Sequence, residues 1–88
     1  MNFVVTGAAS GIGRQLVTLL AQRGDRVLAT DIDHQGLAAS AAESGWPSGS
    51  VVTFVHDVTS SQAWNDAIAL TQERFGSLDG LIAADEAA

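Results

Sequence analysis

Glycines at positions 7, 11 and 13 have a spacing and a context that suit a phosphate-binding turn. They lie between a short β-branched run, 3–6, and a segment of helical periodicity. Glycine has no Cβ, so its backbone allows a positive φ and a close approach by a ligand. A helix that begins there directs its free N–H groups and its positive dipole end toward the same point. The pattern predicts an anion site at Gly7, Gly11 and Gly13; the alternative is an ordinary tight strand-to-helix connection.

Alternating strand and helix patterns place this turn in an α/β fold. Strands are expected at 3–6, 26–30, 50–56 and 78–84, with helices after the glycine turn, from about 33 to 43, and from 59 to 75. Such alternation predicts one domain over residues 1–88, a parallel sheet and right-handed crossovers. We expect the strand order 3-2-1-4, with two helices on one face and the third on the other. The glycine turn then lies at the switch point of the sheet, where such folds bind ligands.

Two local signals predict how the first and third helices are oriented and begin. In the first helix, apolar residues recur at helical spacing and predict a buried stripe made of Ile12, Leu16, Leu19 and Leu20. In the third, Thr59 and Gln62 have the spacing of a capping box.

The overall composition excludes several classes of function. The chain has 88 residues, a net charge of −6 and only four Lys and Arg together, which disfavours nucleic acid and anionic membrane as partners. It contains no cysteine, and its two histidines lie on different predicted elements, so no metal site is expected. Without a basic leader or a long apolar run at the start, the expected location is the cytoplasm.

The segment Thr6-Gly7-x-x-x-Gly11-Ile12-Gly13 resembles the cofactor signature of the short-chain dehydrogenase/reductase family. The resemblance continues at Asp31, at Asp57-Val58 and over 78–82, so it covers nearly all of this chain but only the first part of the usual family length. It implies a Rossmann fold and an oxidoreductase that transfers hydride between NAD or NADP and alcohols or ketones.

The resemblance also implies roles for individual residues in binding the cofactor. Asp31 would accept hydrogen bonds from the adenosine ribose diol and repel a 2′-phosphate. The family's NADP enzymes often carry a basic residue at the place of Ser10, so both positions favour NAD over NADP. Asp57 would bind the adenine amino group while Val58 packs on the ring. By position, Ser10 lies in the phosphate loop, Ile12 beside the pyrophosphate and Ile32 near adenine.

Both aspartates also have simpler interpretations. Asp31 or Asp33 suits the cap of the second helix, and Asp57 suits a loop residue that helps to start the third.

The family's catalytic residues have no counterpart in this sequence. The resemblance places a serine and a Tyr-x-x-x-Lys motif on later elements, and this chain contains no tyrosine and no lysine. The family's Asn-Asn-Ala-Gly is also replaced, by Ala83-Ala84-Asp85-Glu86. We therefore assign no catalytic residue and expect a truncated Rossmann domain that is inactive alone. An exposed edge strand or an uncovered sheet face predicts a homo-oligomer. The alternative function is a non-catalytic oligomerisation or interaction module.

Overall fold

The structure, a computed structural model, describes residues 1–55, 57 and 59–84. Within these ranges the elements follow the predicted β-α-β-α-β-α-β order. They are β1 (Asn2–Thr6), α1 (Gly11–Gln22), β2 (Arg26–Asp31), α2 (His34–Ser44), β3 (Val51–Val55), α3 (Ser61–Phe75) and β4 (Gly80–Ala83). None of these helices is long and apolar enough to cross a membrane.

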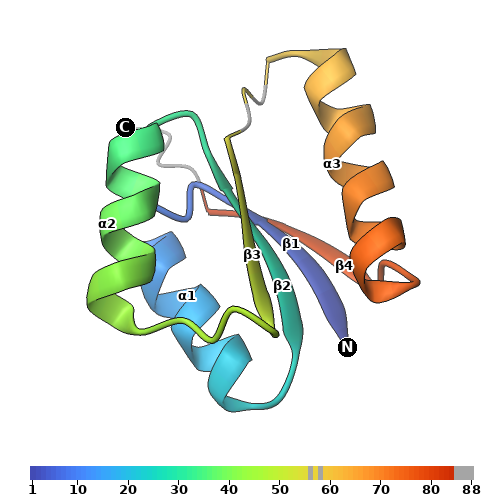
Figure 1. Cartoon of the computed structure of the whole chain (residues 1–88). Coiled ribbons are helices and arrows are strands. Elements are labelled where there is room, and N and C mark those ends of the chain that lie inside the picture. The colour runs from blue at the N-terminus through green and yellow to red at the C-terminus, as the bar shows by residue number, and fades with distance from the viewer. Residues whose placement is uncertain (56, 58, 85–88) are drawn as a thin grey trace.

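The strands form a parallel sheet in the order β3-β2-β1-β4, which confirms the predicted topology. Helices α1 and α2 cover one face, and α3 covers the other, as Figure 1 shows. The arrangement is the expected one, because right-handed crossovers on either side of β1 place their helices on opposite faces.

Most of the buried residues of the sheet lie on its two central strands, β1 and β2. On the face of α1 and α2, the buried cluster includes Val5, Val27 and Leu37. On the face of α3, it consists of Val4, Leu28 and Ala67. Neighbouring residues of one strand thus enter different clusters, because successive side chains point to opposite faces.

The predicted buried stripe of α1 is wrong in part. Ile12 is 61% exposed and Leu19 is 55% exposed, whereas the buried positions of the helix are Gly13, Val17 and Leu20. The close contact of Gly13 with the preceding turn sets the rotation of the helix. A Cβ at Gly13 would lie 2.1 Å from the carbonyl oxygen of Gly7. Since each residue turns an α-helix by about 100°, Ile12 then points away from the sheet.

The predicted capping box of α3 is also wrong, by one residue. The N-cap is Ser60, whose hydroxyl accepts a hydrogen bond from the Ala63 N–H at 3.2 Å. Thr59 instead donates its N–H and its hydroxyl to the Asp57 carboxylate, at 2.9 and 2.7 Å. That contact holds Thr59 in the turn before the helix, so the next residue becomes the cap.

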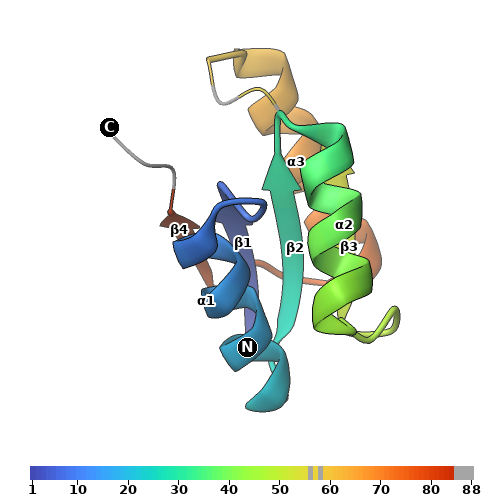
Figure 2. The ribbon, with the colours of Figure 1, turned by 90° about the vertical axis from the view of Figure 1, so that its left-hand side faces the viewer.

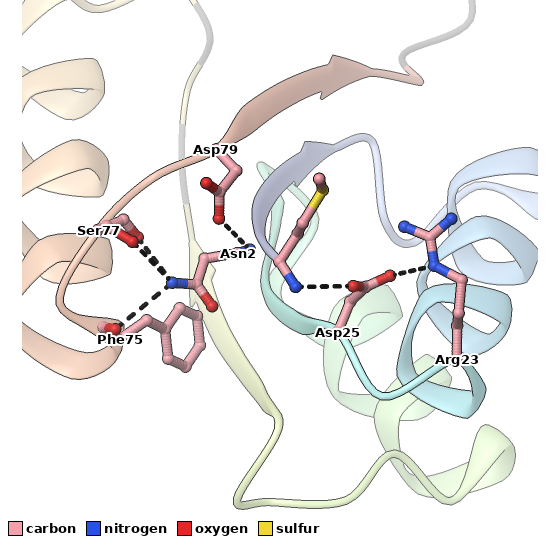
Figure 3. A network of polar contacts seen from close by, with 7 residues as sticks. Asn2, Arg23, Asp25, Phe75, Ser77 and Asp79 are labelled. Carbon is pink, nitrogen blue, oxygen red and sulfur yellow. Dashed lines mark hydrogen bonds and ion pairs between the residues drawn. The ribbon is translucent and has the colours of Figure 1, made fainter.

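A polar network joins three segments at the amino end of β1 (Figure 3). The Met1 amino group and the Arg23 side chain both donate to the Asp25 carboxylate, at 2.9 and 2.6 Å. The Asn2 N–H donates to Asp79 at 2.8 Å, and the Asn2 amide donates to the carbonyl oxygen of Ser77 at 3.1 Å. The start of β1 is therefore fixed to the α1–β2 turn and to the α3–β4 connection.

Candidate functional site

The glycine turn lies where the sequence predicts it, at the carboxyl end of β1 and immediately before α1 (Figure 2). Gly7 has φ 69°, a conformation that side chains rarely adopt. The Ser10 hydroxyl donates to the Gly7 carbonyl oxygen at 2.6 Å and accepts from the Gly13 N–H at 3.1 Å. Ser10 is thus the N-cap of α1, and its hydroxyl is used within the turn.

Two of the three glycines of the motif meet a structural requirement, and each meets a different one. Gly7 supplies a positive φ. Gly13 permits contact between the helix and the turn, which a Cβ would prevent. At Gly11, a Cβ would meet nothing within 4 Å, and its φ is not positive. Neither packing nor backbone strain within the described chain therefore requires glycine at position 11.

Two backbone N–H groups of the first turn of α1 have no hydrogen-bond partner in the part of the chain that the structure describes. The N–H groups of Ala8, Ser10 and Arg14 bond to Thr30, Gly7 and Ser10 carbonyl oxygens respectively. Among the described residues, no such partner is found for the N–H groups of Gly11 and Ile12. Both residues are exposed, so these donors and the positive end of a 12-residue helix face solvent.

Asp31 ends β2 beside this turn. One carboxylate oxygen accepts from the Ala9 N–H at 2.9 Å, and the other accepts from the Asp33 N–H at 2.9 Å. Asp33 is the N-cap of α2, which decides the choice that the sequence left open between Asp31 and Asp33. Asp31 therefore connects the glycine turn to the beginning of α2.

Of the other predicted site residues, Ile32 and Asp57 follow the carboxyl ends of β2 and β3. Ile32 directly follows β2 and is 66% exposed. Asp57 is half-buried and shapes the turn before α3, as the simpler interpretation of this residue expects. Val58 lies outside the described residues. Ile12, in the first turn of α1, and Ile32, next to Asp31, are thus large apolar side chains that are exposed to solvent.

Two pockets lie away from the glycine turn. One, of about 190 Å³, lies between α2 and β3 and includes His34 and Phe54 in its lining. The other, of about 170 Å³, lies between α1 and the segment after α2 and includes Thr18 and Trp46. Neither of these two pockets is lined by residues of the turn.

Comparison with known proteins identifies the family of this fold and turn. The family model for short chain dehydrogenase matches residues 2–84. The chain belongs to the short-chain dehydrogenase family. Proteins of this family bind NAD(P), and the relatives with matching sequences are oxidoreductases.

Individual relatives resemble this chain over nearly all of its length. The 1-deoxy-11-beta-hydroxypentalenate dehydrogenase of Streptomyces avermitilis is 42% identical over 76 residues, which are 86% of this chain and 28% of that protein. A glucose/ribitol dehydrogenase structure from Brucella melitensis has a TM-score of 0.84 at 38% identity, covering 91% of this chain and 33% of that one.

A structure with a bound cofactor is also similar. The 3-ketoacyl-(acyl-carrier-protein) reductase of Brucella melitensis, complexed with NADH, has a TM-score of 0.79 at 26% identity. The match covers 91% of this chain and 32% of that one. This chain therefore spans about a third of the length of the proteins it matches.

Sequence reasoning missed Ala9 as a residue of the site. Its contribution is a backbone N–H, which every residue except proline carries. No sequence signal distinguishes it, because the contact depends on the distance between two segments that only the fold brings together.

Proposed function

We propose that this chain is the NAD-binding N-terminal portion of a short-chain dehydrogenase-type oxidoreductase. The observation that carries the proposal is the pair of unpartnered N–H groups at Gly11 and Ile12, beside the Asp31 carboxylate. Backbone N–H groups at the beginning of a helix bind phosphate without side-chain cations, which suits a chain with a net charge of −6. When bound, the cofactor supplies or accepts the hydride.

The proposed binding surface uses both polar and apolar groups of this edge. The pyrophosphate would lie against the N–H groups of Gly11 and Ile12, and the adenine ring between Ile32 and the segment Asp57-Val58. The exposure of Ile12 and Ile32 supports this arrangement, since a ligand would remove their side chains from water. Ser10 would contribute through the shape of the turn, because its hydroxyl bonds within it.

Asp31 supports a preference for NAD over NADP. Each of its carboxylate oxygens accepts one backbone N–H, and an ionised carboxylate has about four acceptor sites in all. Capacity thus remains for two ribose hydroxyls. A 2′-phosphate would instead meet a negative charge. The cation in the first turn of α1, Arg14, is bound to Glu43 at 3.2 Å and to Ser44 at 2.8 Å. These contacts hold Arg14 toward the carboxyl end of α2.

Substitution of Gly11 tests the site while leaving the fold intact. We expect Gly11→Ala to weaken NAD and ADP-ribose binding, because the new methyl group would stand beside the phosphate donors. Stability should not fall, since alanine is favoured over glycine in a helix by about 1 kcal/mol. The matched control is Gly49→Ala, where a Cβ also meets nothing within 4 Å.

Calorimetric titrations with NAD, NADP and ADP-ribose provide the measurement. The wild type should bind NAD about tenfold or more tightly than NADP, a difference of about 1.4 kcal/mol. Gly49→Ala should match the wild type. Equal or absent binding of all three ligands would contradict the proposal, and so would unchanged binding in Gly11→Ala. With no tyrosine and no lysine in the chain, we expect no dehydrogenase activity from it alone.

A second candidate function is a non-catalytic module for self-association. It is favoured by β4, which pairs with β1 on one side and with no strand on the other among the described residues. On the α3 face of this edge strand, Leu81 is 52% exposed. Unpaired strand edges are ready sites for pairing with another chain.

A charge placed on β4 tests this candidate. We expect wild-type chains to form homo-oligomers at micromolar concentrations, and Leu81→Lys to shift them toward monomer by placing a charge on the edge. Leu19→Lys is the matched control, because Leu19 is 55% exposed but lies on α1. Sedimentation equilibrium gives the measurement, and a monomeric wild type would reject the candidate whatever the nucleotide titrations show.

A further inference from the structure

The glycine turn is fixed to β2 by two adjacent N–H groups that differ in their acceptors. The Ala8 N–H donates to the Thr30 carbonyl oxygen at 2.9 Å. The Ala9 N–H donates to the Asp31 carboxylate, also at 2.9 Å. The first contact needs only backbone, whereas the second exists only because residue 31 carries an acceptor side chain.

The same carboxylate is held in place from its other side by the beginning of α2. It accepts the Asp33 N–H at 2.9 Å, and the Asp33 side chain accepts the Gly36 N–H at 3.0 Å. The first turn of α2 also lies close to the glycine turn, since a Cβ at Gly36 would be 3.3 Å from the Ala9 Cβ. The Asp31 carboxylate therefore accepts one N–H from the glycine turn and one from the residue that caps α2.

We propose that Asp31 is a positioning residue for the glycine turn, in addition to any contact with ribose. By holding the Ala9 N–H, its carboxylate sets the direction in which the N–H groups of Gly11 and Ile12 leave the turn. The consequence for binding rests on the proposed function. The contact itself does not, because it exists without a ligand.

Charge and positioning predict opposite effects when Asp31 is replaced. A carboxylate close to an anion site repels the anion, so its removal alone should strengthen phosphate binding. If Asp31 holds the turn, its removal should weaken binding even of an anion that has no ribose. Inorganic pyrophosphate is such a probe, since it can occupy the phosphate donors but offers nothing to a ribose-binding side chain.

Hydrogen exchange, followed by NMR in the full chain, tests the contact directly. In Asp31→Ala, the Ala9 amide should exchange about tenfold or more faster, as the loss of one hydrogen bond to a charged acceptor implies. The Ala8 amide, bonded to Thr30, should keep its wild-type rate and thereby shows that the fold is intact. Unchanged exchange at Ala9 would overturn the proposal.

Two further variants separate the hydrogen bond between Ala9 and Asp31 from the effects of the Asp31 charge and of the α2 cap. Asp31→Asn removes the same charge but keeps one carbonyl oxygen, so it should retain part of the protection at Ala9. Asp33→Ala removes the cap of α2 and leaves the Asp31 carboxylate in place, so Ala9 should stay protected. If the Ala9 amide exchanged as fast in Asp33→Ala as in Asp31→Ala, the effect would come from α2, and the proposal would be overturned.

Calorimetry with inorganic pyrophosphate tests the consequence for binding. We expect a loss of affinity in Asp31→Ala, a smaller loss in Asp31→Asn, and wild-type affinity in Asp33→Ala. Tighter binding by Asp31→Ala would overturn the positioning role. If neither pyrophosphate nor nucleotide binds the wild type, the proposed function fails, while the exchange rates at Ala9 still decide whether Asp31 holds the turn.

Discussion

Thr6 lies at the end of β1 with its side chain fully buried, and it immediately precedes the glycine turn. Within the described chain, its hydroxyl has no hydrogen-bond partner. Its register partner on β4 is Ala83, and its carbonyl oxygen accepts the Ala84 N–H at 3.1 Å. The family pattern has asparagines in this segment, whereas alanine side chains offer the Thr6 hydroxyl neither donor nor acceptor.

Replacement of Thr6 by valine should therefore stabilise the protein. A buried polar group without a partner costs about 1–3 kcal/mol, and valine has a similar shape without the hydroxyl. We expect Thr6→Val to raise the free energy of unfolding by up to this amount, measured by urea denaturation with tryptophan fluorescence. Thr30→Val is the control, because the Thr30 hydroxyl is equally buried but donates to the Val5 carbonyl oxygen at 3.3 Å.

The control should respond with the opposite sign. Loss of the Thr30 hydrogen bond should lower the free energy of unfolding by about 0.5–1.5 kcal/mol. A destabilised Thr6→Val would mean that the Thr6 hydroxyl is satisfied in solution and would contradict the prediction.

At the scale of single residues, the sequence predicts which positions belong to the candidate site, but it does not predict the contacts between them. The place of the glycine turn and the position of Asp31 at the end of β2 could be predicted, because both follow from local pattern. The bond from Ala9 to Asp31 could not, since it joins residues 22 positions apart through a backbone group. The roles of Asp31 and Asp57 toward a nucleotide remain predictions.

At the scale of the elements, the order of strands and helices follows from sequence, but the rotation of α1 and the start of α3 do not. Hydrophobic spacing alone selected Ile12 and Leu19 for the buried side of α1. The close contact at Gly13 turns both toward solvent. Likewise, Thr59 and Ser60 are both good caps by type. The Asp57 carboxylate decides between them by binding Thr59 in the preceding turn. Hydrophobic spacing and cap residue types are local features of the sequence, whereas the rotation of α1 and the cap of α3 depend on contacts with neighbouring segments.

At the scale of the whole molecule, the two ends of the sheet have different characters. The carboxyl ends of β1 and β2 carry exposed isoleucines and N–H donors that have no partner among residues 1–55, 57 and 59–84, and these groups suit a ligand. The amino end of β1 is closed by the network of Figure 3, in which one chain end meets two distant turns. The Asp25 side chain at its centre is only 7% exposed, while that of its partner Arg23 is 62% exposed.

This closed end should make the stability of the molecule depend on pH. The hydrogen bond from the Met1 amino group, followed by that from Arg23, holds the pKa of the Asp25 carboxyl below its ordinary value of 3.8. Because the pKa is lower in the folded state than in the unfolded one, ionised Asp25 stabilises the fold fully above the ordinary value. That contribution is lost as the pH falls through the lowered value.

We therefore expect the free energy of unfolding to fall as the pH is lowered through this acid range, and to fall less steeply in Asp25→Asn. Arg23→Gln removes one partner and keeps the Met1 contact, so its pH dependence should lie between those of the wild type and Asp25→Asn. Urea denaturation at a series of pH values, on chains with an untagged Met1, provides the measurement. Equal slopes for wild type and Asp25→Asn would show that the network at the amino end of β1 does not couple protonation of Asp25 to folding.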